Sequence, residues 1–162
     1  MTKAVTPIAG VTITDGTATN VQGFAPGTTV QADNGGLLVF VSATSTISQY
    51  NAVIIDDKGG AVPVSTTNAT TSKRLAIAQT SIASSYFGWV QVGGNPLVTL
   101  AANAAPAVAL YTTATGGVLG TTTVSGGLAL GIVATTSISN ATAVTCVAAV
   151  GMMVGTGNPV AP

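Results

Sequence analysis

The chain has 162 residues, of which 5% are charged, and its formal net charge is zero. An ordinary soluble domain carries about 25% charged residues, so this chain lacks most of the side chains that keep the surface of a free monomer hydrated. Four cations balanced by four anions cannot follow a phosphate backbone, which argues against a nucleic-acid partner. A hydrophobic content of 47% excludes a disordered chain.

The surface must therefore consist largely of Thr, Ser, Asn, Gln, Gly and Ala. The cores of protein interfaces are depleted in charge, so we expect much of this surface to be buried in a larger assembly. The alternative is an extracellular or thermally hardy protein with a neutral polar coat.

The side chains that most enzymes use are scarce. The sequence contains no His, and its four acidic residues are all Asp. Cys146 is the single cysteine and has no His to act as its base, so we expect a small buried hydrophobe rather than a nucleophile. Asp56 and Asp57 are adjacent in a Gly-rich turn, where a solvated turn tip is the simplest interpretation and a weak Ca²⁺ site is the alternative. We predict no enzymatic activity, no metal site and no cofactor.

No segment of the sequence suggests a membrane partner. Residues 4–10 do not form the apolar stretch of a signal peptide. Thr, Ser, Asn, Gly and Pro interrupt every apolar run before about 18 residues, which is too short for a transmembrane helix.

Val, Ile and Thr dominate the chain, and Gly or Pro interrupts it at short intervals. These residues favour strands over helices, and many short strands with regular turn signals are typical of a sandwich or barrel. We predict an all-β fold, a small sandwich or barrel of short antiparallel strands. Residues 1–34 contain repeated turn signals and are expected to form an extended N-terminal arm or a loosely attached first hairpin, with residues 35–162 as the β domain. An irregular first third of a single domain is the alternative.

The clearest strands begin after residue 36. Residues 37–41 form a continuous apolar run, which indicates a strand buried on both faces. Residues 51–55 and 61–64 flank the turn at 56–60 and predict a hairpin, with Pro63 indicating an edge position. Further strands are expected at 74–80, 106–111, 128–134 and 141–154.

The segment 86–92 is the most informative strand. Alternation places Tyr86, Gly88, Val90 and Val92 on one face and Phe87, Trp89 and Gln91 on the other. Residues 93–96 read Gly-Gly-Asn-Pro, a turn signal, so residues 86–100 predict a second hairpin.

Residues 86–94, Tyr-Phe-Gly-Trp-Val-Gln-Val-Gly-Gly, resemble a strand found in head decoration, or cement, proteins of tailed bacteriophages. The apolar stretch at 104–111, the Thr-Gly-Gly turn after it and the segment 131–137 are also similar to that family. The resemblance covers roughly residues 75–154, and the N-terminal third shows none.

The resemblance implies a virion structural protein, made in the host cytoplasm and bound to the outer surface of the capsid. Its partners would be the major capsid protein and itself, as a homotrimer or alternatively a dimer. Such proteins hold neighbouring capsomers together, and many weak links acting at once stabilise the shell by avidity.

Four residues are candidates for interfaces. Trp89 and Gln91 lie in the resembling strand, where a core role for Trp89 is the alternative. Lys73 and Arg74 form a basic spot that could pair with an acidic patch on a partner. All eight charged residues lie at or before Arg74, so we expect the chain after it to supply the packed core and contacts between like subunits, and the earlier part to grip the shell.

Two other functions fit the composition. A host-facing fibre or adhesin module could bind cell-surface glycans with an apolar, Thr-rich surface, although sugar sites usually use more aromatic residues. An ice-binding or surface-layer protein could use the Thr-x-Thr pairs, but their uneven spacing does not give the fixed period that a solenoid needs.

Overall fold

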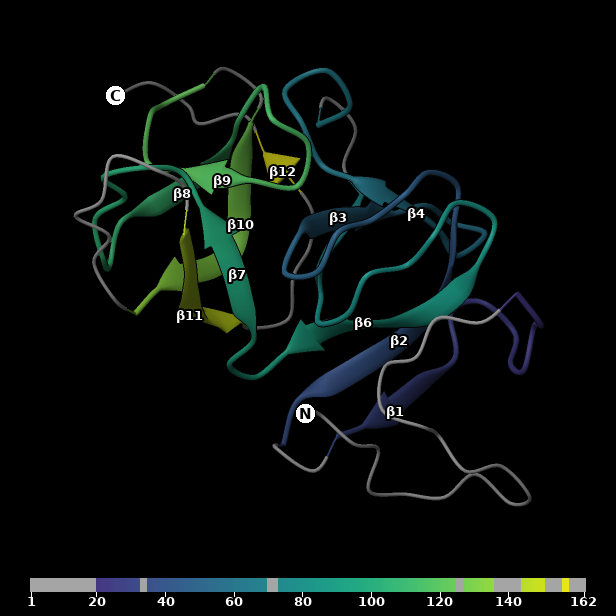
Figure 1. The fold of residues 1–162 in the computed structure, drawn as a ribbon. Helices are drawn as coiled ribbons and strands as arrows, with labels where there is room; N and C mark the ends of the chain where they lie inside the picture. Colours follow the sequence, from purple (N-terminus) through teal and green to yellow (C-terminus); the bar gives the residue numbers. More distant parts are fainter. Residues whose placement is uncertain are drawn as a thin grey trace.

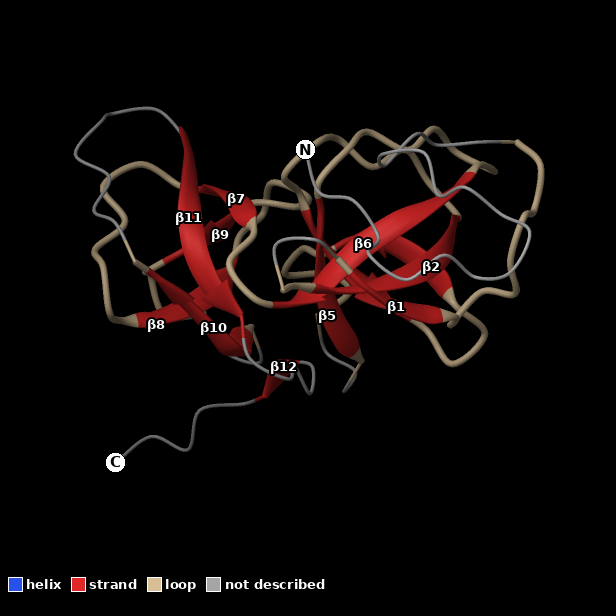
Figure 2. Ribbon diagram, turned by 90° about the horizontal axis from the view of Figure 1, so that it is seen from below, coloured by secondary structure: helices blue, strands red, loops and turns tan. Residues whose placement is uncertain are grey.

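The computed structural model describes residues 20–32, 35–69, 73–124, 127–135, 144–150 and 156–157. This part of the chain consists of strands and loops without a helix, as expected from its content of β-branched residues (Figure 2). The strands gather into two groups that lie side by side (Figure 1).

The first group is a closed five-stranded barrel. Its strands are β2 (Leu37–Ala43), β3 (Ala52–Ile55), β4 (Gly60–Pro63), β5 (Arg74–Ala78) and β6 (Phe87–Gly93). They lie in the order β2-β4-β3-β5-β6, and β6 pairs back onto β2, which closes the ring. Four of the five pairings are antiparallel, and β2 with β4 is parallel.

Alternation along these strands gives the barrel a filled interior. The inward-facing side chains form one apolar cluster, and these are Val39, Val41, Ala43, Ile47, Val53, Ile55, Ala61, Ala76, Ala78, Ile82, Val90 and Val92. Small side chains predominate, as the interior of a small barrel requires. Gly88 is also required here, because a Cβ at that position would lie 2.7 Å from Cδ1 of Ile82.

A further strand, β1 (Thr29–Gln31), lies on the edge of β2 next to β4. The segment before it follows β2 as well: the Gly27 N–H donates to the Phe40 carbonyl at 2.7 Å, and the Phe40 N–H donates to the Thr28 carbonyl at 2.8 Å. Residues 20–32 therefore pack on the outside of the barrel.

The second group contains β7 (Leu97–Leu100), β8 (Ala109–Thr112), β9 (Leu119–Gly120), β10 (Leu128–Ala134) and β11 (Val144–Val150). These five strands also close into a ring, because β11 pairs with both β7 and β10. Strand β12 (Thr156–Gly157) pairs with the beginning of β10.

The two barrels share one apolar cluster. It joins the outer face of β3 and β5 in the first barrel to the core of the second barrel, and its largest fully buried members include Ile54, Leu75, Ile77, Leu100 and Leu110. The turn between β8 and β9 fastens the contact, since the Gly117 N–H donates to the Val64 carbonyl at 2.7 Å and the Gly117 carbonyl accepts from the Ala52 N–H at 2.8 Å.

The all-β fold predicted from the sequence is confirmed, as are several of its elements. Residues 38–41 are buried on both faces, and β3 and β4 form the predicted hairpin. The strands are not all antiparallel, however, because each barrel contains one parallel pair. The described part of the segment 1–34 includes β1, and residues 1–19 and 33–34 lie outside the described residues.

The hairpin predicted over residues 86–100 is wrong. Strand β7 pairs with β11 and β9, not with β6, so residues 94–96 form the connection between the two barrels. The side-chain amide of Gln79 contributes to this arrangement, because its Nε2 donates to the Leu97 carbonyl at 3.0 Å and its Oε1 accepts from the Leu97 N–H at 3.3 Å. The expectation that the chain after Arg74 supplies the packed core is also wrong, because the interior of the first barrel draws on residues from 39 to 92.

Two adjacent threonines in the second barrel provide a matched test of hydrogen bonding. Thr112 is fully buried, and its Oγ1 has no hydrogen-bond partner among the described residues, whereas Thr113 Oγ1 lies 3.0 Å from the carbonyl oxygens of Thr115 and Val118. Removing an unpaired buried hydroxyl relieves its desolvation cost, so we expect Thr112→Val to raise the free energy of unfolding by about 1 kcal/mol. Thr113→Val should lower it by about 1 kcal/mol. Urea unfolding followed by circular dichroism checks both, and a loss of stability in Thr112→Val would contradict the assignment.

Candidate interaction surfaces

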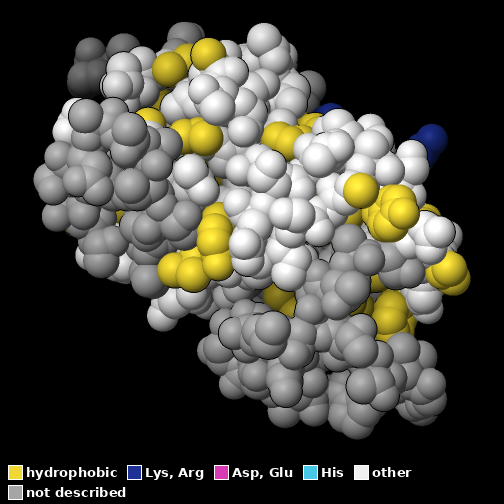
Figure 3. Space-filling model, viewed as in Figure 1, with side chains coloured by type: hydrophobic (Ala, Val, Ile, Leu, Met, Phe, Trp, Pro, Cys, Tyr) yellow, Lys and Arg dark blue, Asp and Glu magenta, His cyan; other side chains and the backbone are white. Residues whose placement is uncertain are grey.

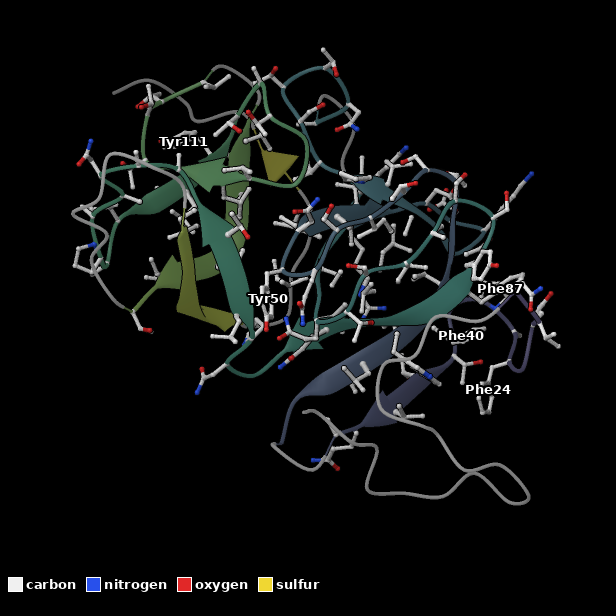
Figure 4. All side chains as sticks on the ribbon, in the orientation of Figure 1. Phe24, Phe40, Tyr50, Phe87 and Tyr111 are labelled. Atoms are coloured by element: carbon white, nitrogen blue, oxygen red, sulfur yellow. The ribbon has the colours of Figure 1, made fainter. Side chains whose placement is uncertain are left out.

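An aromatic cluster covers the outer face of β2 and β6 in the first barrel. Phe40 on β2 and Trp89 on β6 are cross-strand partners with ring centroids 5.0 Å apart. Phe87 stacks on Phe40 at 5.9 Å, and Phe24 meets Phe40 edge-on at 5.5 Å and Trp89 at 5.4 Å. Figure 4 shows the three phenylalanines together on this side of the molecule. Such geometries are favourable beyond the area that they bury, so the cluster fastens residues 20–32 to the barrel.

This packing determines what Trp89 and Gln91 can contact. Trp89 is 6% exposed and Gln91 is fully buried. Gln91 Nε2 donates to the Gly93 carbonyl at 2.8 Å, and its Oε1 has no partner among the described residues. Both side chains therefore belong to the core of this chain, and their contact with a neighbouring subunit stays a prediction.

Lys73 and Arg74 lie at the start of β5 and are both half-buried. Arg74 pairs in the backbone with Ile55, directly before the Asp56 turn. The structure does not bring these two cations together with Trp89 or Gln91 in one cluster, since Trp89 packs with Phe24, Phe40 and Phe87. Their contact with an acidic patch on a partner stays a prediction.

The Asp56 carboxylate stabilises the turn that contains it. Its Oδ1 accepts hydrogen bonds from the backbone N–H groups of Lys58 at 2.9 Å and Gly60 at 2.7 Å. The Asp56 N–H also donates to the Gly60 carbonyl at 2.8 Å. Asp56, Asp57 and Lys58 are exposed, so the geometry is that of a solvated turn closed by an aspartate side chain.

Exposed apolar side chains are the feature that the sequence reasoning missed. Within the described part of the chain the large ones are Val21, Leu37, Tyr86, Leu97, Val108 and Val133. Three of these six lie on the second barrel, and Val133 on β10 is the direct cross-strand partner of Ala109 on β8. On the face shown in Figure 3, hydrophobic side chains form small patches among uncharged polar atoms, and Lys or Arg atoms are visible at one edge. Alternation within residues 128–134 could have indicated that Val133 faces outward.

Other kinds of site have little support in the described part of the chain. Cys146 lies on β11, where its backbone pairs with Val98. The described residues contain no group of three His, Cys, Asp or Glu that could hold a metal ion. They also contain no helix of the length and apolar character needed to cross a membrane. Comparisons with protein-family models, with curated proteins and with solved structures find no match.

Proposed function

We propose that this chain is a structural protein of a tailed-bacteriophage virion, which binds the outer surface of the capsid and links neighbouring capsomers. The observation that carries the proposal is the surface: apolar side chains such as Tyr86, Val108 and Val133 are exposed on a chain that is 5% charged. Interface cores combine low charge with exposed apolar groups of this kind. The sequence resemblance centred on residues 86–94 supports a phage head as the assembly in question.

The two barrels suit a protein that stabilises a shell under internal pressure. A closed barrel leaves no free edge along its ring, and the apolar cluster shared by the two barrels resists their separation. Many copies on a repeating surface would then stabilise it through avidity, even if each contact is weak. In this proposal the chain has no catalytic residue and no cofactor, and its partners are the major capsid protein and other copies of itself.

The glycan-binding alternative receives less support from the positions of the aromatic rings. Phe24, Phe40, Phe87 and Trp89 pack on one another rather than on open surface. Among the described residues, Tyr86 is the exposed large aromatic side chain, at 37%. A glycan site usually needs an exposed aromatic platform, and a single ring supplies little of one.

The proposal predicts binding to heads that depends little on salt. The purified chain would be mixed with undecorated mature heads built from the major capsid protein encoded with it, and the heads would be pelleted. We expect saturable co-sedimentation that changes less than about threefold between about 0.05 and 0.5 M salt, because charge-poor contacts are little screened.

Immature heads of the same capsid protein are the matched control, since the phage decoration proteins that the sequence resembles bind the head after it matures. Bound chain should also raise the temperature at which mature heads release their contents. A chain that stays in the supernatant at every concentration, or that binds only at low salt, would contradict the proposal.

A further inference from the structure

The two barrels repeat one strand arrangement. Strands β2 to β6 correspond in order to β7 to β11: in each barrel the first and third strands are parallel, and the other four pairings are antiparallel. The two rings therefore have the same topology, including the position of their one parallel pair.

The correspondence extends to individual residues. Cross-strand pairs in the first barrel have counterparts at the same place in the register of the second. Val41–Gly88 corresponds to Val98–Cys146. Ile55–Ala61 corresponds to Thr112–Leu119, and Ile54–Leu75 corresponds to Tyr111–Leu128. Gly59 and Gly117, in the two corresponding turns, have φ values of 79° and 80°.

The backbone repeats an uncommon conformation as well. Tyr50 and Ala107 both have positive φ, at 65° and 56°, which is unfavourable for residues other than Gly. The Tyr50 N–H donates to the Ala78 carbonyl at 2.7 Å, and the Ala107 N–H donates to the Ala134 carbonyl at 3.0 Å. The sequence is similar here too, with Ala-Gln-Thr-Ser-Ile beginning at Ala78 and Ala-Thr-Thr-Ser-Ile beginning at Ala134. The chain therefore contains the same barrel arrangement twice.

Each barrel has a turn that docks and a face that can receive it. We call the turns around Gly59 and Gly117 the head turns. We call the outer face of β3 and β5 the tail face of the first barrel, and the outer face of β8 and β10 the tail face of the second. Within the chain, the head turn of the second barrel docks on the first barrel beside its tail face, where Gly117 bonds to Ala52 and Val64.

The free head turn at the start of this array is covered. A Cβ placed on Gly59 would overlap the side chain of Pro26 and lie 2.9 Å from the Pro26 carbonyl carbon, so residues 26–27 pack directly against that turn. Residues 20–32 thus cap the first barrel in the way that terminal repeats are usually capped.

Among the described residues, none covers the tail face of the second barrel in a comparable way. In the first barrel the tail-face residues Ala52 and Ile77 are fully buried by the second barrel. Their counterparts in the second barrel are Ala109, which is exposed, and Val133, which is 42% exposed. Val108 beside them is 40% exposed.

We propose that the tail face of the second barrel seats a second copy of this chain. The equivalent face of the first barrel is buried by a barrel of the same fold, whereas this face, also uncharged and partly apolar, is left exposed. Val108, Ala109, Tyr111, Leu128 and Val133 carry no charge, so the face matches the uncharged surface of another copy rather than a charged partner. Since the head turn of each copy is capped, the internal contact cannot be repeated between copies. The tail face therefore meets another part of the second copy, and the association closes as a small oligomer. The inference rests on the proposed function only in giving that oligomer a role.

The test is the mass of the chain in solution. Sedimentation equilibrium at about 1 to 100 μM, which brackets micromolar affinities, should show a dimer or trimer for the wild-type chain. Val133→Asp places a carboxylate in the contact and should raise the dissociation constant by about tenfold or more. Val108→Asp lies just before β8 and should have the same effect with less risk to the strand.

Leu37→Asp is the matched control, because Leu37 is also a strand residue and is 40% exposed, but lies on the first barrel. It should leave the mass unchanged. A monomeric wild-type chain, oligomers that survive both Val133→Asp and Val108→Asp, or equal dissociation by Leu37→Asp would each overturn the inference.

The pelleting assay with heads separates this inference from the proposed function. An oligomer that is lost in Val133→Asp but never binds heads would support the inference and remove the capsid proposal. A monomer that binds heads, and loses that binding in Val133→Asp, would assign the tail face to the capsid protein and overturn the inference.

Discussion

Phe40→Ala should lower the free energy of unfolding by about 3–5 kcal/mol, the cost typical of removing a buried phenylalanine. Phe40 is 2% exposed and contacts the rings of Phe24, Phe87 and Trp89. Its loss would leave a cavity between the barrel and the segment that caps it. For a chain of this size the unfolding temperature should fall by roughly 10 °C or more.

The fluorescence of Trp89 reports on this change, because Trp89 is the single tryptophan of the sequence and lies in the aromatic cluster. Its emission should shift to longer wavelength in Phe40→Ala, and the fluorescence-detected denaturation midpoint should fall. Tyr86→Ala is the control, since Tyr86 directly precedes β6 but is 37% exposed. This substitution should lower the free energy of unfolding by less than about 1 kcal/mol. Equal midpoints for Phe40→Ala and the wild type would show that the cluster does not stabilise the barrel.

Gly117→Ala should be the second most damaging change, with an expected loss of about 3 kcal/mol. Part of the cost is the positive φ of 80°, which is unfavourable for any residue with a Cβ by about 1–2 kcal/mol. The rest arises at the contact between barrels, because the new Cβ would overlap the Asn51 side chain, whose own Cβ would lie 2.6 Å away.

Two further variants separate these contributions. Gly35→Ala shares a positive φ of 75° but has no atom within 4 Å of the added Cβ, so it should lose only about 1 kcal/mol. Asn51→Gly removes the Asn51 Cβ as well as its amide, so it should restore part of the stability of Gly117→Ala, giving a coupling energy of about 1 kcal/mol or more in a double-mutant cycle. Chemical unfolding followed by circular dichroism gives all four values, and additive effects of Asn51→Gly and Gly117→Ala would mean that the two side chains do not meet.

The labelled side chains in Figure 4 illustrate why the junction matters. Tyr50 lies between the two groups of strands, and its carbonyl accepts a hydrogen bond from the Thr99 N–H at 3.0 Å. Tyr111, at the place in the second barrel that corresponds to Ile54, is half-buried instead of covered by another barrel. Equivalent positions in the two barrels therefore have different environments. Ile54 is covered by the second barrel, whereas Tyr111 is not covered by another barrel of the chain.

The candidate sites were predictable to different degrees. The turn at Asp56 follows from local rules, since an aspartate before a Gly-Gly pair can accept the N–H groups of its own turn. Trp89 and Gln91 were correctly placed on one face of their strand. The sequence could not show that residues 20–32 pack over Trp89, or that the Gln91 amide donates to the Gly93 carbonyl. Alternation could have placed Val133 on the outer side of its strand. Whether Val108 and Val133 are then exposed depends on which barrel another barrel covers, and no local signal contains that information.

The sequence by itself determined the class of the fold and much of its local structure. Val, Ile and Thr in short alternating runs specified strands, the Asp-Asp-Lys-Gly-Gly turn specified the β3–β4 hairpin, and alternation specified the two faces of β6, because each depends on neighbours along the chain. Only the tertiary structure decided the partners of the strands. The turn residues Gly93 to Pro96 are compatible with a next strand that folds back on β6 and with one that enters a second barrel. Long-range contacts, such as that of Gln79 with Leu97, decide between the two. The repeat is clearest in three dimensions for the same reason. Hydrophobic size and alternation suffice to keep the register of a barrel, so the two halves preserve their hydrogen-bonded pairs while most of their residues differ outside the short match of 78–82 with 134–138.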